Sequence, residues 1–238
     1  MSTQLDLGGI TLDVVRKDIK NVHLSVHPPV GKVRLSAPRR MSLDTIRLFA
    51  ISKLGWIRQQ QKTLRAQERD SPHEYLDRES HHVWGRRYLL QLVEEDAAPS
   101  VQLHHAKLVL RVRPGSDEAT RAATMANWYR QLLKAAIPPL IAAWSPRLNV
   151  TVQGFYVQQM KTRWGSCNPA AGTIRLNTEL ARKPTECLEY IVVHEMVHLL
   201  DPTHGPRFVA LMDRFLPAWQ DTRNLLNRLP ARHEKWRY

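Results

Sequence analysis

One segment of the sequence limits the fold more than any other, because it is apolar almost throughout and yet carries ionisable side chains at fixed spacing. Residues 186–200 place His194, Glu195 and His198 among leucine, isoleucine, valine and methionine residues. In a helix, residues four apart lie on the same face, so the two imidazoles would point in one direction. A helix with so broad an apolar surface has to be buried, and there polar side chains are costly unless they have partners. The sequence therefore predicts a central, buried helix that contains a polar site.

The spacing of these polar side chains is typical of a metal site that activates water. His194 and His198 could bind one ion, and His204, beyond the break at Asp201-Pro202, is the natural third ligand. Glu195 lies about 100° around the helix from His194, so it can take a proton from water instead of joining the ligands. Three protein ligands and an open position indicate a catalytic Zn²⁺ site, one ion per chain, although such sites also accept other divalent metals. The alternative is a pair of packing or surface histidines beside an exposed glutamate.

The rest of the chain is predicted to combine short strands with long helices. Ser42 is a candidate N-cap for a helix over residues 43–68, and a second long helix is expected over 117–148, where Pro138-Pro139 should kink or divide it. Gly85 should mark a bulge or turn within a strand region. Strands are expected over residues 11–15, 22–26, 33–36, 82–95, 150–157, 161–164 and 173–177, and a hairpin that turns near His105-Ala106 is expected over 101–112. Helices are expected over residues 186–200, after Pro206, and over 220–229.

These elements predict an α+β protein. Composition shifts after the second long helix, and we divide the chain into a β-rich N-terminal part, residues 1–116, and a C-terminal part, residues 117–238, that holds the metal site. The two parts are expected to act as one continuous unit.

Charge is the second unusual feature of the sequence. There are 35 lysines and arginines against 22 acidic residues, a formal net charge of +13. A strongly basic protein attracts polyanions, so nucleic acid is a candidate partner. The polar face of the helix over residues 43–68 could contribute to such a surface, although a solvated helix face explains it as well. Its basic residues are Arg47, Lys53, Arg58, Lys62 and Arg65.

No membrane partner is expected, because no apolar run approaches the roughly 18–20 residues that a membrane helix needs. The N-terminus has no layout of a signal peptide. Two cysteines, Cys167 and Cys187, do not make a disulfide framework. A reduced, cytoplasmic protein is the expectation.

Several blocks of sequence point to a known family. The ligand spacing matches metzincins, but Asp201 stands where those proteins have glycine, and no Met-turn is evident. The chain resembles the YgjP-like metallopeptidase family much more closely, a group related to the SprT and WLM zincins. This resemblance is carried by HEMVHLLDPTHGPRF at 194–208, MKTRWGSC at 160–167, IRLN at 174–177, SKLGWIRQQ at 52–60 and WGRRYLLQL at 84–92.

The resemblance implies a zincin-like fold, zinc bound by His194, His198 and His204, and a catalytic Glu195. Members of the family are described both as peptidases and as UTP pyrophosphatases, so it implies a metal-dependent hydrolase without fixing the substrate.

Four further residues are candidates for substrate binding. Lys161 and Arg163 fall on or beside a predicted strand, which could pair with an extended peptide, hold phosphates beside the metal, or form surface ion pairs. Tyr190 precedes His194 by four residues and could donate a hydrogen bond to a developing oxyanion, or it could simply pack. Arg207 could orient an anionic substrate or stabilise the local structure.

Three functions from different classes remain open on the sequence alone. A peptidase or amidase is favoured by the metal motif beside a strand. A nucleotide pyrophosphatase acting on UTP is favoured by the excess of basic over acidic residues and by Lys161 and Arg163. A basic nucleic-acid-associated protein, in which the metal site is secondary, is the third hypothesis.

Overall fold

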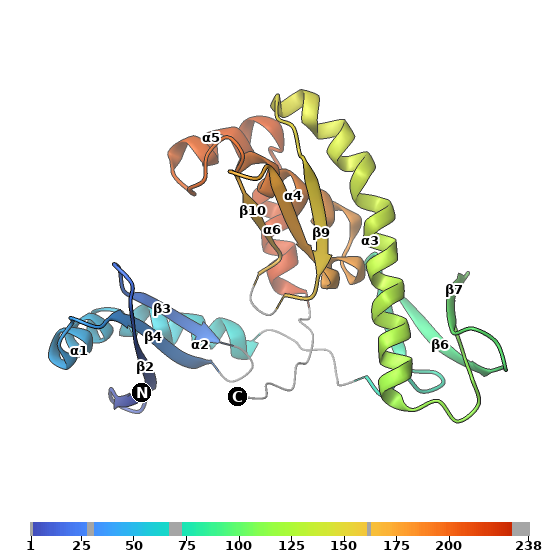
Figure 1. Cartoon of the computed structure of the whole chain (residues 1–238), viewed down its shortest axis with the longest axis horizontal. Coiled ribbons are helices and arrows are strands. Elements are labelled where there is room, and N and C mark those ends of the chain that lie inside the picture. Colours follow the sequence, from blue (N-terminus) through green and yellow to red (C-terminus); the bar gives the residue numbers. More distant parts are fainter. Residues whose placement is uncertain (1, 28–30, 67–72, 161–162, 230–238) are drawn as a thin grey trace. The chain divides into compact units, whose positions relative to one another are not determined.

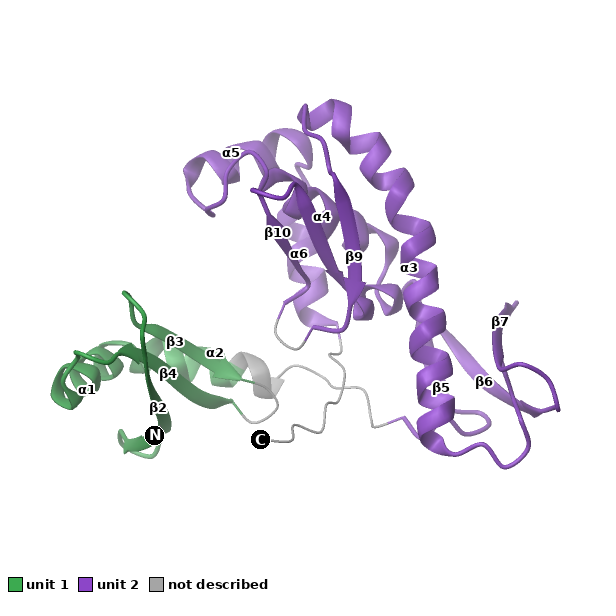
Figure 2. Cartoon of the chain, in the orientation of Figure 1, with its two compact units in different colours: residues 1–71, 230–238 green, residues 72–229 purple. Residues whose placement is uncertain are grey.

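The computed structural model describes residues 2–27, 31–66, 73–160 and 163–229. The predicted α+β class is confirmed. The chain divides into two compact units, residues 1–71 with 230–238 and residues 72–229 (Figures 1 and 2). This boundary differs from the predicted division at residue 116, because two of the strands before residue 116 pack against the long helix that follows them.

The first unit contains a four-stranded sheet with the strand order β1-β2-β4-β3. Strands β2 and β4 are parallel neighbours. Their alternate apolar side chains, Leu12 and Val14 on β2 and Val33 and Leu35 on β4, are almost completely buried, as the period of two in a strand requires. The strands span Ser2–Asp6 (β1), Thr11–Lys17 (β2), His23–His27 (β3) and Lys32–Pro38 (β4).

Two helices, α1 (Leu43–Ser52) and α2 (Leu54–Ala66), complete this unit. Ser42 caps α1 as predicted, since its hydroxyl accepts a hydrogen bond of 3.1 Å from the Thr45 backbone N–H. The prediction of one helix over residues 43–68 is wrong, because the chain leaves helical geometry at Lys53; residues 67–68 lie outside the described residues. Both helices bury apolar side chains in the core of the first unit. The basic side chains Arg47, Lys53, Arg58 and Lys62 are exposed.

The second unit contains two sheets. The first has the order β5-β6-β8-β7 and is built from Ser80–Val83 (β5), Arg86–Glu94 (β6), Ser100–His104 (β7) and Lys107–Val112 (β8). The second has the order β10-β11-β9 and is built from Gly154–Gln158 (β9), Gly165–Asn168 (β10) and Thr173–Asn177 (β11). Of the strand predicted over 161–164, residues 161–162 lie outside the described residues and residues 163–164 are not in a strand. β10 begins at Gly165 and forms one edge of its sheet.

A helix of 31 residues, α3 (Glu118–Leu148), connects these two sheets along the chain. It continues through Pro138 and Pro139, so these residues do not divide it. Its buried side chains recur mostly every four residues on both sides of the proline pair, and this packing supports the helix where the prolines remove backbone hydrogen bonds. They are Met125, Tyr129, Leu133, Ile137, Trp144 and Leu148. None of the helices in the described ranges is both long and apolar enough to cross a membrane.

Helix α4 (Thr185–Val197) lies at the centre of the second unit, as its apolar sequence predicts (Figure 1). It contacts α3, α5 (Pro206–Phe215), α6 (Trp219–Arg228) and the strands β10 and β11. A short 3-10 helix, η1 (Thr178–Arg182), leads into it from β11. Nine of its thirteen residues are buried, so any polar side chain on α4 is held in a fixed environment.

The turn between β5 and β6 is joined by backbone hydrogen bonds to the segment before α4. Trp84 and Gly85 donate backbone hydrogen bonds of 2.9 and 3.2 Å to the carbonyls of Ala181 and Arg182. Gly85 has a φ of +77°, and a Cβ atom there would lie 2.7 Å from Cγ of Pro184. Glycine is required at this turn both for its backbone conformation and for the close approach.

We expect Gly85→Ala to lower the free energy of unfolding by about 2–4 kcal/mol, because backbone strain and a clash with Pro184 add together. Gly115→Ala is the matched control: Gly115 has a φ of +73° but no atom within 4 Å of an added Cβ. That control should lose only about 1 kcal/mol. Urea denaturation of both variants measures the difference, and equal losses would contradict the role given to the Pro184 contact.

Candidate metal centre

Three imidazoles converge at one end of α4. The Nε2 atom of His204 lies 3.1 Å from Nε2 of His194 and 3.2 Å from Nε2 of His198. His194 and His198 are one turn apart on the helix, and the chain then turns back before α5 to bring His204 to them. The three predicted ligands are thus together, in an arrangement that could hold a metal ion.

The pKa shifts of two of these histidines suit metal binding. Burial, together with the charges of His198, His204 and Arg223, lowers the pKa of His194 to about 3. The pKa of His204 is also lowered, mainly by burial. A metal ligand has to be a neutral imidazole, and Nε2 atoms that converge at 3.1–3.2 Å fit the donor set of a nitrogen-binding divalent metal.

Contacts on the far side of the rings fix their orientation. Nδ1 of His198 donates a hydrogen bond of 3.0 Å to the backbone carbonyl of Asp201, which leaves Nε2 as the lone pair. The Asp201 carboxylate accepts hydrogen bonds from the backbone and hydroxyl of Thr203, at 3.0 and 2.9 Å, and so shapes the turn that leads to His204. Phe208 of α5 contacts all three imidazoles, with ring centroids 4.7–4.9 Å apart.

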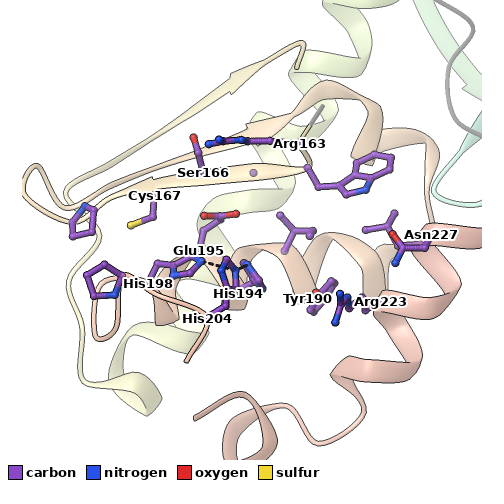
Figure 3. Close-up of a pocket in the computed structure, with 16 residues that line it drawn as sticks. Arg163, Ser166, Cys167, Tyr190, His194, Glu195, His198, His204, Arg223 and Asn227 are labelled. Atoms are coloured by element: carbon purple, nitrogen blue, oxygen red, sulfur yellow. Dashed lines mark hydrogen bonds between the residues drawn. The ribbon is translucent and has the colours of Figure 1, made fainter. Parts of the chain in front are cut away.

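Glu195 is held between α4 and the edge strand β10 (Figure 3). It is 4% exposed, and burial raises the pKa of its carboxyl group to about 8, against the opposing charge of Arg163. A Cβ atom on Gly165 would lie 2.5 Å from Oε1 of Glu195. The absence of a side chain at Gly165 therefore gives the glutamate its room, a role that the sequence analysis did not identify.

A cavity of about 570 Å³ opens over the histidines and Glu195. Its wall is formed by α4, by residues Trp164–Cys167 along the edge strand, and by α6. The pKa of Cys167 is raised to about 11, chiefly by burial and also by the charge of Glu195, so its thiol stays protonated and is not a nucleophile. The cavity thus joins a candidate metal site to a strand with a free edge.

The predicted substrate residues have different locations. Arg163 and Tyr190 line the cavity. Arg163 follows residues 161–162, which lie outside the described residues. The buried Asn177 amide donates hydrogen bonds of 2.9 and 2.8 Å to the backbone carbonyls of Met160 and Arg163. Lys161 lies outside the described residues. Arg207 is exposed in the first turn of α5 and is not among the described residues that line the cavity.

Sequence analysis missed two polar residues of the cavity, Arg223 and Asn227 on α6. They are four residues apart and therefore share one helix face. The helix itself was predicted, but its polar residues are so numerous that spacing alone does not distinguish these two. Tyr190 is buried, with its ring edge-on to His194 at 5.8 Å between centroids, and its pKa is raised, mainly by burial.

The model of the YgjP-like family, described as a metallopeptidase domain, matches residues 20–229. The chain belongs to the YgjP-like family. That family is one of metal-dependent hydrolases, in agreement with the convergent histidines. No curated protein matches the chain's sequence.

Two solved structures are similar to part of this YgjP-like chain. The zymogen of the metallopeptidase abylysin from Pyrococcus abyssi is 18% identical, with a TM-score of 0.36 over 40% of this chain and 99% of that one. The zymogen of the metallopeptidase jannalysin from Methanocaldococcus jannaschii is 21% identical, with a TM-score of 0.34 over 38% of this chain and 92% of that one.

A second group of ionisable residues lies near the start of the unit that holds the candidate metal centre. His73, Glu79 and His81 have ligand atoms close enough together to hold an ion. However, Arg182 lies 3.0 Å from Nε2 of His73, and a guanidinium at that distance repels a cation. The Glu79 carboxylate also binds Nδ1 of His73 and the backbone N–H groups of two residues in the turn before it. We interpret this group as a structural hydrogen-bonding cluster.

His81 is fully buried in this cluster. Its Nε2 lies 3.1 Å from Glu79 but without the alignment of a hydrogen bond, and both ring nitrogens lack a hydrogen-bond partner. Burial lowers its pKa to about 3, and the charges of His73 and Arg182 act in the same direction.

Acid should therefore destabilise the second unit through His81. In the unfolded chain histidine titrates near pH 6.5. Between pH 6.5 and 3 the unfolded state therefore binds a proton at this residue that the folded state does not, and the free energy of unfolding decreases as the pH decreases. The loss by pH 4.5 should be about 2–3 kcal/mol. In His81→Phe this part of the pH dependence should disappear, whereas His104→Gln, a change at an exposed histidine of the same sheet, should keep it. Denaturation at several pH values measures both slopes, and an unchanged slope in His81→Phe would contradict the assignment.

Gly165→Ala should disable the site without removing a single polar group. The new methyl group would displace the Glu195 carboxylate, so we expect hydrolysis to fall at least about 100-fold while metal content stays at the wild-type level. Gly154→Ala on β9 is the control, because the nearest atom to its added Cβ is 3.8 Å away. Metal analysis and activity of the two variants check this; an active Gly165→Ala would show that the contact is not limiting.

Proposed function

We propose that this chain is a zinc-dependent peptidase in which Glu195 activates the attacking water. The observation that carries the proposal is the convergence of three imidazole Nε2 atoms beside a buried carboxylate, at the free edge of a strand. Membership of the YgjP-like family supports it. His194, His198 and His204 would hold the ion through Nε2, leaving a position open toward the cavity. When bound, zinc would act as a Lewis acid toward a carbonyl oxygen and toward water.

Glu195 would act as general base and then as general acid. Its carboxylate takes the proton of the attacking water and delivers it to the leaving amine as the peptide bond breaks. Burial raises the pKa of the Glu195 carboxyl group and so favours its protonated form in the second step, whereas the positive charge of a bound divalent ion would favour the ionised form that the first step needs. Gly165 and the packing of β10 on α4 fix its direction.

The edge strand would align the substrate. Among the described residues β10 pairs with β11 alone, so the backbone groups of its other edge would be available to an extended peptide beside the cavity. The Tyr190 hydroxyl stays protonated because burial raises its pKa, and it would donate a hydrogen bond to the oxyanion that develops at the scissile carbonyl. Arg163 would hold a substrate carbonyl or carboxylate from the opposite wall. The proposed mechanism assigns no role in substrate binding to Arg207 or Lys161.

A second candidate function is hydrolysis of a nucleotide such as UTP. Two arginines in the cavity, Arg163 and Arg223, favour it, because guanidinium groups bind phosphates in pairs of hydrogen bonds. The same metal site and Glu195 would then act on a phosphoryl group. The family description favours the peptidase. For nucleic acid, the favourable feature in the described ranges is the set of exposed basic residues of α1 and α2.

The proposal predicts different effects of two substitutions on zinc and activity. Untagged protein should contain one zinc ion per chain; His204→Ala should lose or weaken it, and Glu195→Gln should keep it. Cleavage of an unfolded protein such as casein should fall about 10²–10⁴-fold in Glu195→Gln, because general acid–base catalysis is lost. Glu186→Gln, an exposed glutamate in the first turn of α4, is the control and should behave as wild type.

The same preparations test the second candidate. Release of pyrophosphate from UTP that disappears in Glu195→Gln, together with no cleavage of casein or of peptides, would favour the nucleotide hydrolase. Equal activity of Glu195→Gln and wild type on every substrate would rule out the mechanism in both forms.

A further inference from the structure

Arg223 has no role in the chemistry described above, yet it faces the reaction site. It lies on α6 one turn before Asn227, and both line the cavity with Tyr190 (Figure 3). Its guanidinium is 6.0 Å from the ring of Trp219, which in turn stacks on Tyr190. The cavity that Arg223 lines also contains His194 and Glu195. Arg223 is therefore part of the wall that a substrate touches.

The charge of the cavity calls for an anionic ligand. Arg163 and Arg223 both line it, and no described carboxylate forms an ion pair with either. Glu195 is the single acidic residue among the described residues of the lining, and it is directed at β10. A divalent ion held by the three histidines would add further positive charge. A substrate that brings a carboxylate would be stabilised here, and one that brings an ammonium group would be repelled.

The direction of the edge strand indicates which part of a peptide would reach Arg223. β10 runs from Gly165 to Asn168, and Cys167 lies farther from Arg223 and Asn227 than Ser166 does (Figure 3). A peptide paired antiparallel to β10 would run the opposite way, from the Cys167 end toward the Arg223 end. The residues that follow the scissile bond would then lie beside Arg223, Asn227 and Tyr190.

We propose that Arg223 is a specificity-determining residue that binds a substrate carboxylate on the C-terminal side of the scissile bond. The guanidinium donates paired hydrogen bonds to the carboxylate oxygens, and the Asn227 side chain lies beside them. The carboxylate is either an Asp or Glu side chain or the free C-terminus of a short peptide. This inference rests on the proposed peptidase function and adds its substrate class.

The test uses quenched fluorescent peptides that differ at one position. Each position after the cleavage point carries Glu, Gln or Lys in turn, and a second pair of peptides ends in a free carboxylate or an amide. Zinc-loaded wild type should cleave the carboxylate peptides with a kcat/KM about 10- to 100-fold above their neutral counterparts, since a hydrogen-bonded charge is involved. Arg223→Gln should lose this preference mainly through KM. Arg228→Gln, an exposed arginine of the same helix outside the cavity, should keep it.

The two sources of the carboxylate give different results. Preference for Glu over Gln at one internal position identifies a side chain, and preference for the free over the amidated end identifies the C-terminus. Three results would overturn the proposal: no preference for either, a preference unchanged in Arg223→Gln, or a fall in kcat of equal size for all peptides. The last would make Arg223 a stabiliser of the reacting atoms.

A binding measurement separates this inference from the peptidase proposal. Glu195→Gln loaded with zinc should bind the same peptides without turnover, and fluorescence anisotropy should show about 10- to 100-fold tighter binding of the carboxylate forms, lost when Arg223→Gln is added. If wild type cleaves no peptide but this Arg223-dependent binding is present, the peptidase proposal fails and the carboxylate site stands. If peptides are cleaved but binding ignores the carboxylate, the carboxylate site fails alone.

Discussion

The burial of α4 is the constraint on which the rest of the second unit depends. The helix is apolar nearly all round, so it has to be enclosed, and α3, α5, α6 and the β9–β11 sheet each cover part of it. It also carries two histidines and Glu195, whose charged forms are expensive to bury. Burial accordingly lowers the pKa of His194 to about 3 and raises the pKa of the Glu195 carboxyl group to about 8. A metal ion at the Nε2 atoms would relieve part of this cost, so that metal binding and stability are linked.

Each structural element that covers α4 also contributes a distinct part of the site. The turn after α4 brings in His204 through the Asp201–Thr203 hydrogen bonds, and Phe208 at the start of α5 packs against all three imidazoles. β10 leaves space for Glu195 at Gly165 and presents its free edge to the cavity. α6 brings Arg223 and Asn227. The same packing that excludes water from α4 therefore assembles the groups around it.

Local patterns in the sequence predicted what depends on local geometry. The i, i+4 spacing of His194 and His198, the hydroxyl cap at Ser42 and the hairpin turn near His105 each involve residues close in the chain, and the structure has the elements as expected. The break at Lys53 was missed because both flanking segments have helical periodicity. The parallel pairings of β2 with β4 and of β11 with β9 join strands that are not consecutive, and periodicity carries no information on such partners.

The parts of the candidate site that sequence reasoning missed share one physical cause. Gly165 matters because of what its missing Cβ would touch, the Glu195 carboxylate thirty residues away in the chain. Arg223 matters because helix α6 packs beside α4 and turns one face to the cavity. Neither residue belongs to a recurring spacing, and an arginine on a polar helix or a glycine at the start of a strand has many ordinary explanations.

The arrangement separates chemistry from substrate choice. The candidate ligands and Glu195 lie on α4 and the turn that follows it, where close packing leaves little freedom for change. Arg223 and Asn227 are exposed on α6, the last described helix, and neither belongs to the apolar core that encloses α4. Under the proposed function, a substitution at these two positions would alter which peptide is preferred while the packing around Glu195 is retained. For this reason substrate preference in a fold of this kind is better sought on α6 and along β10 than in the histidine motif that first draws attention.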